Sequence, residues 1–139
     1  MKLGKKLEYD NNMDKETIEL CNVINSVKGL ETEESCCGHG KESFIIFFMS
    51  YSDKGLFFLS RCVNHRYWKY GHLWNISMEI GDDLKNGKLP ISYVLSSNKV
   101  KGKEAYKQAK DLVENMNYHL NHVNFKKLFG YDENDFYLS

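Results

Sequence analysis

The feature of this chain that most constrains its fold is a periodic apolar pattern between Lys103 and Leu120. Small and aliphatic residues recur there at intervals of four and three: Ala105, Ala109, Leu112, Met116 and Leu120. Residues at this spacing share one face of an α-helix. The pattern predicts an amphipathic helix of about five turns, and its apolar face requires a second layer to pack against.

Strand-forming segments supply that layer. An extended segment, 29–34, follows the first helical pattern, and the apolar run Phe44–Met49 is typical of a central strand covered on both faces. Residues 73–80 and 91–95 predict a long hairpin around a turn rich in Gly, Asp and Asn. In its first strand, alternation predicts one shared face for Trp74, Ile76, Met78 and Ile80.

Two further helices are predicted upstream. The first begins after Asp14 as N-cap and is stopped by Gly29, with a buried stripe of Ile18, Cys21, Ile24 and Val27. The second has Asp53 as its expected cap and an apolar stripe of Leu56, Leu59, Val63 and Tyr67.

The order of these elements predicts an α+β fold. We expect one domain over residues 1–139, with a sheet of about four mixed or antiparallel strands and three helices packed mainly on one face. Residues 1–13 form a loose N-terminal arm in this interpretation. Residues 130–139 form an acidic, aromatic tail that either docks as a short strand or frays.

Composition argues against several classes of protein. The chain has 19 basic and 19 acidic residues, which disfavours binding to duplex DNA. It has neither an apolar stretch of the roughly 18 residues that a membrane span needs nor the apolar core of a signal peptide. We therefore expect a cytoplasmic protein with reduced cysteines, and we expect Cys21 to be a small core residue.

Polar chemistry is concentrated in the loop between the first two predicted strands. Its two glycines allow consecutive backbone N–H groups to turn toward an anion. The segment 64–70 adds cations and flat rings suited to a nucleotide, although the same residues are also typical of a helix end. The predicted ligand-binding residues are Ser35, Cys36, Cys37, Gly38, His39, Gly40 and Lys41 in the loop, with Arg66, Trp68 and Trp74.

Metal binding and catalysis are weaker interpretations of the same residues. Cys36, Cys37 and His39 are competent metal ligands, but adjacent cysteines cannot easily share one tetrahedral ion. The pairs Cys62/His65 and His119/His122 have helical spacing, and we expect the latter pair to face solvent at a helix end. A cysteine nucleophile with His39 as base lacks an identifiable orienting acid. We therefore assign no catalytic residue, no metal and no cofactor.

The loop resembles that of a group of small phage and prophage proteins. These share the signature T-x-x-S-C-x-G-H-G between a helix and an apolar strand, followed by a tryptophan-bearing strand. Here the matching residues are Thr32, Ser35, Cys36, Gly38, His39, Gly40 and Trp74, with the helix start Glu104–Ala109. The resemblance covers most of residues 14–116 and implies no established activity.

The same loop is more distantly similar to the opening of the wybutosine-synthesis protein 3 family. That family uses S-adenosylmethionine to methylate a modified guanosine in tRNA, and its motif reads Thr-Thr-Ser-Ser-Cys-Ser-Gly-Arg. This chain keeps Ser35, Cys36 and Gly38 but has His39 in place of the arginine.

The leading hypothesis is a small phage-type ligand-binding protein. We expect it to sequester a nucleotide-derived host defence signal, ADP-ribose-like or a cyclic nucleotide, in the cytoplasm of the bacterial host, as an oligomer. One alternative is an inhibitor that binds a host protein through the aromatic tail 129–138. The other is a methyltransferase-like protein that modifies RNA.

Overall fold

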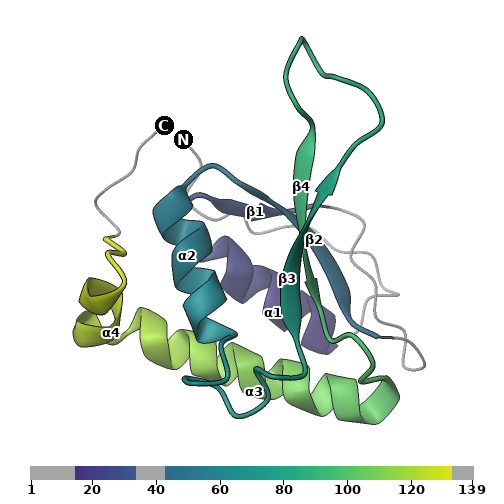
Figure 1. Cartoon of the computed structure of the whole chain (residues 1–139). Coiled ribbons are helices and arrows are strands. Elements are labelled where there is room, and N and C mark those ends of the chain that lie inside the picture. Colours follow the sequence, from purple (N-terminus) through teal and green to yellow (C-terminus); the bar gives the residue numbers. More distant parts are fainter. Residues whose placement is uncertain (1–14, 34–42, 133–139) are drawn as a thin grey trace.

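The computed structural model describes residues 15–33 and 43–132, and these form an α+β fold (Figure 1). The predicted four-stranded sheet with helices is confirmed. Residues 1–14, 34–42 and 133–139 lie outside the described part, and with them the predicted N-terminal arm and most of the tail. The elements in chain order are α1 (Lys15–Asn25), β1 (Leu30–Thr32), β2 (Ile45–Ser50), α2 (Asp53–Cys62), β3 (Asn75–Ile80), β4 (Ile91–Ser96), α3 (Gly102–Leu120) and α4 (Val123–Leu128).

The sheet has the order β1-β2-β4-β3, and each neighbouring pair is antiparallel. Leu95 of β4 lies opposite Ile46 on one side and Ile76 on the other. β2 is therefore a central strand, as predicted, and β1 and β3 are the edges. The predicted hairpin is confirmed: it joins β3 to β4, and its arm extends beyond the helices (Figure 1).

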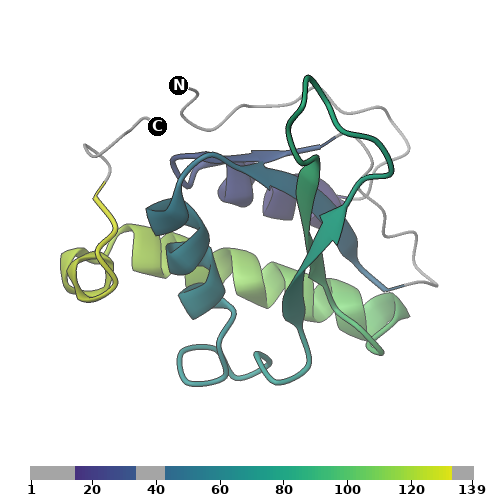
Figure 2. The ribbon, with the colours of Figure 1, turned by 45° about the horizontal axis from the view of Figure 1, so that its top comes forward.

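The hydrophobic core lies between one face of the sheet and the helices (Figure 2). Ile46 and Phe48 of β2 face it and are fully buried, together with Leu112 and Met116 of α3. The neighbouring residues of β2, such as Phe47, point to the other face and are only half-buried. The prediction that both faces of β2 are covered is therefore wrong, because the helices pack on one side.

The predicted helices are confirmed with changed ends. α1 stops at Asn25, and Gly29 adopts a left-handed φ of +89° in the turn into β1. The N-cap of α2 is Ser52, whose Oγ accepts a hydrogen bond from the N–H of Gly55 at 3.1 Å. Asp53 is the first residue of that helix and not its cap. None of the helices in the described part of the chain has the length and apolar character needed to cross a lipid bilayer.

The sequence did not indicate α4 or what it covers. Phe125 of α4 is nearly buried and stacks on the ring of His119, with centroids 3.6 Å apart. His119 is only 8 % exposed, so the expectation that it faces solvent is wrong, whereas His122 is exposed. Tyr131 stacks on Phe58 in the core, so this first part of the tail docks through a ring and not as a strand.

Candidate functional site

The predicted ligand-binding loop, Ser35 to Lys41, lies outside the described residues, but the structure describes its frame. The loop connects β1 to β2, as the sequence predicted. After the loop, the N–H of Phe44 donates to Ser97 Oγ at 2.9 Å, and the N–H of Ser97 donates to the carbonyl of Phe44 at 3.1 Å. The hydroxyl of Ser43 donates to the carbonyl of Asn98. The end of the loop is thereby fixed against the segment that leads from β4 into α3.

The start of the loop is held by a buried pair of side chains on α1 and β1. The backbone N–H of Thr32 donates to Asn25 Oδ1 at 2.8 Å, and Asn25 Nδ2 donates to Thr32 Oγ1 at 2.9 Å. Asn25 is 2 % exposed and Thr32 is 4 % exposed. The amide oxygen of Asn25 therefore accepts the outward-facing N–H of Thr32, as a backbone carbonyl of a neighbouring strand would.

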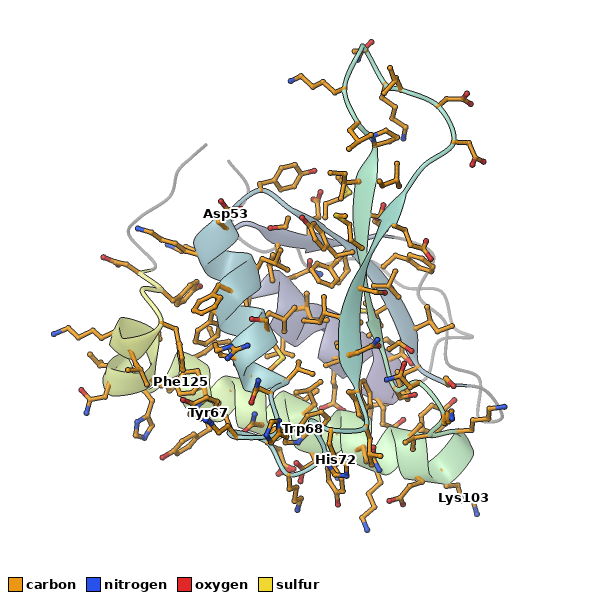
Figure 3. All side chains as sticks on the ribbon, viewed as in Figure 1. Asp53, Tyr67, Trp68, His72, Lys103 and Phe125 are labelled. Atoms are coloured by element: carbon orange, nitrogen blue, oxygen red, sulfur yellow. The ribbon has the colours of Figure 1, made fainter. Side chains whose placement is uncertain are left out.

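Three exposed lysines lie beside the fixed end of the loop, at Lys99, Lys101 and Lys103. They flank the start of α3, where Lys101 is the N-cap residue and makes no side-chain capping hydrogen bond. The first N–H groups of a helix lack partners within the helix and favour anions. Figure 3 shows Lys103 at the end of α3 that lies away from Phe125. The sequence analysis did not predict this cluster of positive charge, although lysines at every second position before a helix can be recognised in the sequence.

The two predicted tryptophans lie together beneath this end of the sheet. Their ring centroids are 5.5 Å apart, and Trp74 lies 6.0 Å from the ring of Phe44 at the base of the loop. Trp74 Nε1 donates to Gln108 Oε1 at 2.8 Å, and Trp68 Nε1 donates to Asp111 Oδ1 at 2.7 Å. Each tryptophan is only 4 % exposed. The structure shows them as core residues, with Trp74 next to Phe44, and their contact with a ligand stays a prediction.

Arg66 lies in the exposed turn after α2, where its N–H donates to Asn64 Oδ1 at 2.9 Å. Among the described residues, no contact joins Arg66 to the base of the loop. Its neighbour His65 lines a small pocket of about 230 Å³ together with Trp74 and Asn75. Trp74 therefore connects the predicted segment 64–70 to the base of the loop, and the role of Arg66 stays a prediction.

The two described thiols, Cys21 and Cys62, and the imidazole of His119 are buried in the core, whereas the other described histidines are exposed. Burial raises the pKa of the Cys62 thiol to about 12, which keeps it protonated and makes it a poor metal ligand or nucleophile. Burial lowers the pKa of His119; the backbone carbonyl of Tyr67 opposes this shift, and the nearby His122 adds to it. Within residues 15–33 and 43–132, no three His, Cys, Asp or Glu side chains are grouped closely enough to hold a metal ion.

Comparison of the chain with models of protein families, with curated proteins and with solved structures gave no match. The functional argument therefore rests on the chemistry of the residues themselves.

Proposed function

We propose that this chain binds a small phosphate-containing ligand at the end of the sheet where the 35–41 loop and the start of α3 meet. The observation that carries the proposal is the pair of contacts from Ser43 and Phe44 to Asn98 and Ser97. Because of these contacts, a loop rich in glycine and polar side chains ends next to three exposed lysines. Anion-binding chemistry from two separate segments of the sequence is thus directed to one region.

The ligand class follows from the donors that these segments offer. The glycine-flanked backbone N–H groups of the loop and the N–H groups at the start of α3 suit phosphate oxygens. Lys41, Lys101 and Lys103 supply compact positive charges, and Ser35 and His39 add donors that suit a phosphate or a ribose hydroxyl. These groups together favour a nucleotide-derived molecule, either ADP-ribose-like or a cyclic nucleotide.

The resemblance to small phage proteins supports sequestration as the role of this binding. In this proposal the chain captures a nucleotide-derived defence signal in the cytoplasm of a bacterial host and holds it without converting it. The loop residues Ser35 to Lys41 contact the phosphate or ribose. Trp68 and Trp74 stiffen the region from below.

The test is a thermal-shift and calorimetry panel of ADP-ribose, cyclic AMP, cyclic GMP and inorganic phosphate, with native mass spectrometry of the freshly purified protein. One nucleotide class is expected to raise the melting temperature by several degrees. The double variant Lys101→Gln/Lys103→Gln and the variant His39→Ala are each expected to weaken that binding at least tenfold. The matched control is Lys85→Gln/Lys88→Gln, which removes the same charge at the tip of the β3–β4 hairpin. Equal loss in both double variants would contradict the proposed location, because only the global charge would then matter.

Two further probes separate this proposal from its alternatives. S-adenosylmethionine belongs in the panel because the loop is similar to that of the wybutosine-synthesis protein 3 family, and a shift with that compound alone would favour methyl transfer.

For the host-protein alternative, deletion of residues 129–138 removes Phe129 and Tyr131, which pack in the aromatic core. Truncation after Asp132 keeps both rings and is the cleaner variant for a pull-down from host lysate.

A further inference from the structure

The outer edge of β3 presents backbone groups that no described strand pairs with. The N–H of Gly81 donates to the carbonyl of Pro90 at 2.8 Å, so Gly81 directs its backbone groups toward the β4 side. Because this direction alternates along a strand, Asn75, Ser77 and Glu79 also face β4. Ile76, Met78 and Ile80 therefore direct their N–H and C=O groups to the free edge.

The side chains of the same three residues form an apolar row, in which Ile76 is half-buried and Met78 and Ile80 are exposed. Met78 is 54 % exposed and Ile80 is 55 % exposed, since β3 extends beyond the helices that cover the sheet (Figure 1). Across from this row, Phe57 of α2 is 47 % exposed. Between α2 and β3 lies a groove of about 400 Å³, which we call the α2–β3 groove; it is lined by Leu56, Phe57, Ile76, Met78 and Tyr93, among others. Contiguous exposed apolar side chains of this kind mark an interaction surface.

The two edges of the sheet differ in how they are protected. β1 has only three residues, and the outward-facing N–H of Thr32 donates a hydrogen bond to the Asn25 side chain. β3 is twice as long and has no lysine, proline or inward-pointing charge, which are the usual protections of an edge strand. Its one charged residue, Glu79, points away from the helices. β3 is thus the edge that is built to accept another strand.

We propose that this edge pairs with β3 of a second copy of the chain, antiparallel, about a two-fold axis perpendicular to the sheet at Met78. Because the outward backbone groups belong to Ile76, Met78 and Ile80, these residues must face one another across the axis. Met78 then lies opposite Met78 of the second copy, and Ile76 lies opposite Ile80. Each facing pair exchanges two backbone hydrogen bonds, and all the exposed apolar side chains of β3 meet on the helix side.

Charge and strand length select this register over its neighbours. Centred on Met78, the pairing sets Glu79 opposite the small polar Ser77. Centring on Glu79 would oppose two like charges, which is destabilising. Centring on Ser77 would set Ile80 opposite Trp74, which lies outside β3 and is buried. The result is a continuous eight-stranded sheet with the helices of both copies on one face.

The first test is sedimentation equilibrium of the full-length chain over a range of concentrations. The wild type is expected to be a dimer at micromolar concentration. Met78→Lys places two positive charges opposite each other and is expected to weaken dimerisation at least tenfold. Ser77→Lys is the matched control, because it adds the same charge to the same strand but faces Glu79 of the second copy. A monomeric wild type, or equal dimerisation by both lysine variants, would overturn the proposal.

A second measurement does not depend on how the lysine variants fold. In a Cys36→Ser/Cys37→Ser background, Met78→Cys is expected to form an intermolecular disulfide under mild oxidation. Facing hydrogen-bonded residues have Cα atoms about 5.5 Å apart, within the range of a disulfide. Ser77→Cys does not face itself and is expected to stay uncrosslinked. Cys21 and Cys62 are fully buried and contribute no background. Equally fast crosslinking of both variants would contradict the register and with it the proposal.

Discussion

The substitution Asn25→Ala tests how the chain is held where it enters the predicted ligand-binding loop. It removes the acceptor of the Thr32 N–H and the donor to the Thr32 hydroxyl, both at a buried position. The hydroxyl can rotate toward another partner, but the backbone N–H cannot. We therefore expect the orphaned N–H to dominate the loss of stability.

The expected loss follows from these two groups. A buried polar group left without a partner costs about 1–3 kcal/mol, and a hydrogen bond contributes about 1 kcal/mol net. Alanine favours the helix over asparagine by roughly 0.5 kcal/mol, which offsets a little of this cost. The free energy of unfolding is thus expected to fall by about 2–3 kcal/mol, a large share of the 5–15 kcal/mol typical of a domain.

Urea unfolding followed by tryptophan fluorescence measures this loss. With a slope of about 1–3 kcal/mol per molar urea, the midpoint is expected to move by roughly 0.7–3 M. Asn22→Ala is the matched control on the same helix, because Asn22 Oδ1 has no hydrogen-bond partner in the described part of the chain. Thr32→Val completes a double-mutant cycle, and its effect is expected to shrink once Asn25 is absent. A loss below about 1 kcal/mol for Asn25→Ala, or additive effects in the cycle, would refute the reasoning.

Three further predictions concern buried groups. Because burial lowers the pKa of His119 in the folded state, the unfolded chain binds more protons below pH about 6.5, and stability falls from pH 7 to pH 5. In urea titrations His119→Phe should flatten this dependence, and an unchanged slope would exclude His119 as its source. Iodoacetamide at pH 7.5 should leave Cys62 unmodified in the folded protein and label it in urea, as peptide mass spectrometry would show. Gly29 has a φ of +89°, and a Cβ at this position would collide with Ser52. The melting temperature of Gly29→Ala should therefore fall by several degrees; an unchanged value would contradict this.

The elements that the sequence predicted best are those defined by local periodicity. α3 and the β3–β4 hairpin follow from apolar spacing and from turn residues, which act within one segment. The tip of the hairpin is an Asn86–Gly87 pair with positive φ at both residues, as such a turn requires. By contrast, the covering of β2 on one face only depends on where distant helices pack. The burial of His119 likewise depends on a six-residue helix too short to give a periodic signal.

The same distinction separates the predicted and unpredicted parts of the candidate site. A flanking strand on each side of the 35–41 loop could be predicted, because both strand signals adjoin the loop in sequence. The contact between Ser43 and Asn98, which are 55 residues apart, could not be predicted, since it arises from the pairing of β2 with β4. The burial of Trp68 and Trp74 depends in the same way on Asp111 and Gln108 of α3. The residue type predicted aromatic rings in this segment, but it could not predict which residues would bury them.

The two proposed surfaces have a geometric relation that keeps their tests independent. The ligand-binding end lies at the Asn75 end of β3, and the proposed two-fold axis passes through Met78. Antiparallel pairing about that axis directs the two proposed ligand-binding ends away from each other, toward opposite ends of the paired β3 strands. If both proposals hold, each copy is expected to bind its own ligand, and the dimer is expected to take up two ligands without cooperativity. Met78→Lys should leave the thermal shift given by the nucleotide unchanged, and Lys101→Gln/Lys103→Gln should leave the dimer mass unchanged. If Met78→Lys changed the thermal shift, or if Lys101→Gln/Lys103→Gln changed the dimer mass, at least one of the two surfaces would lie elsewhere than proposed.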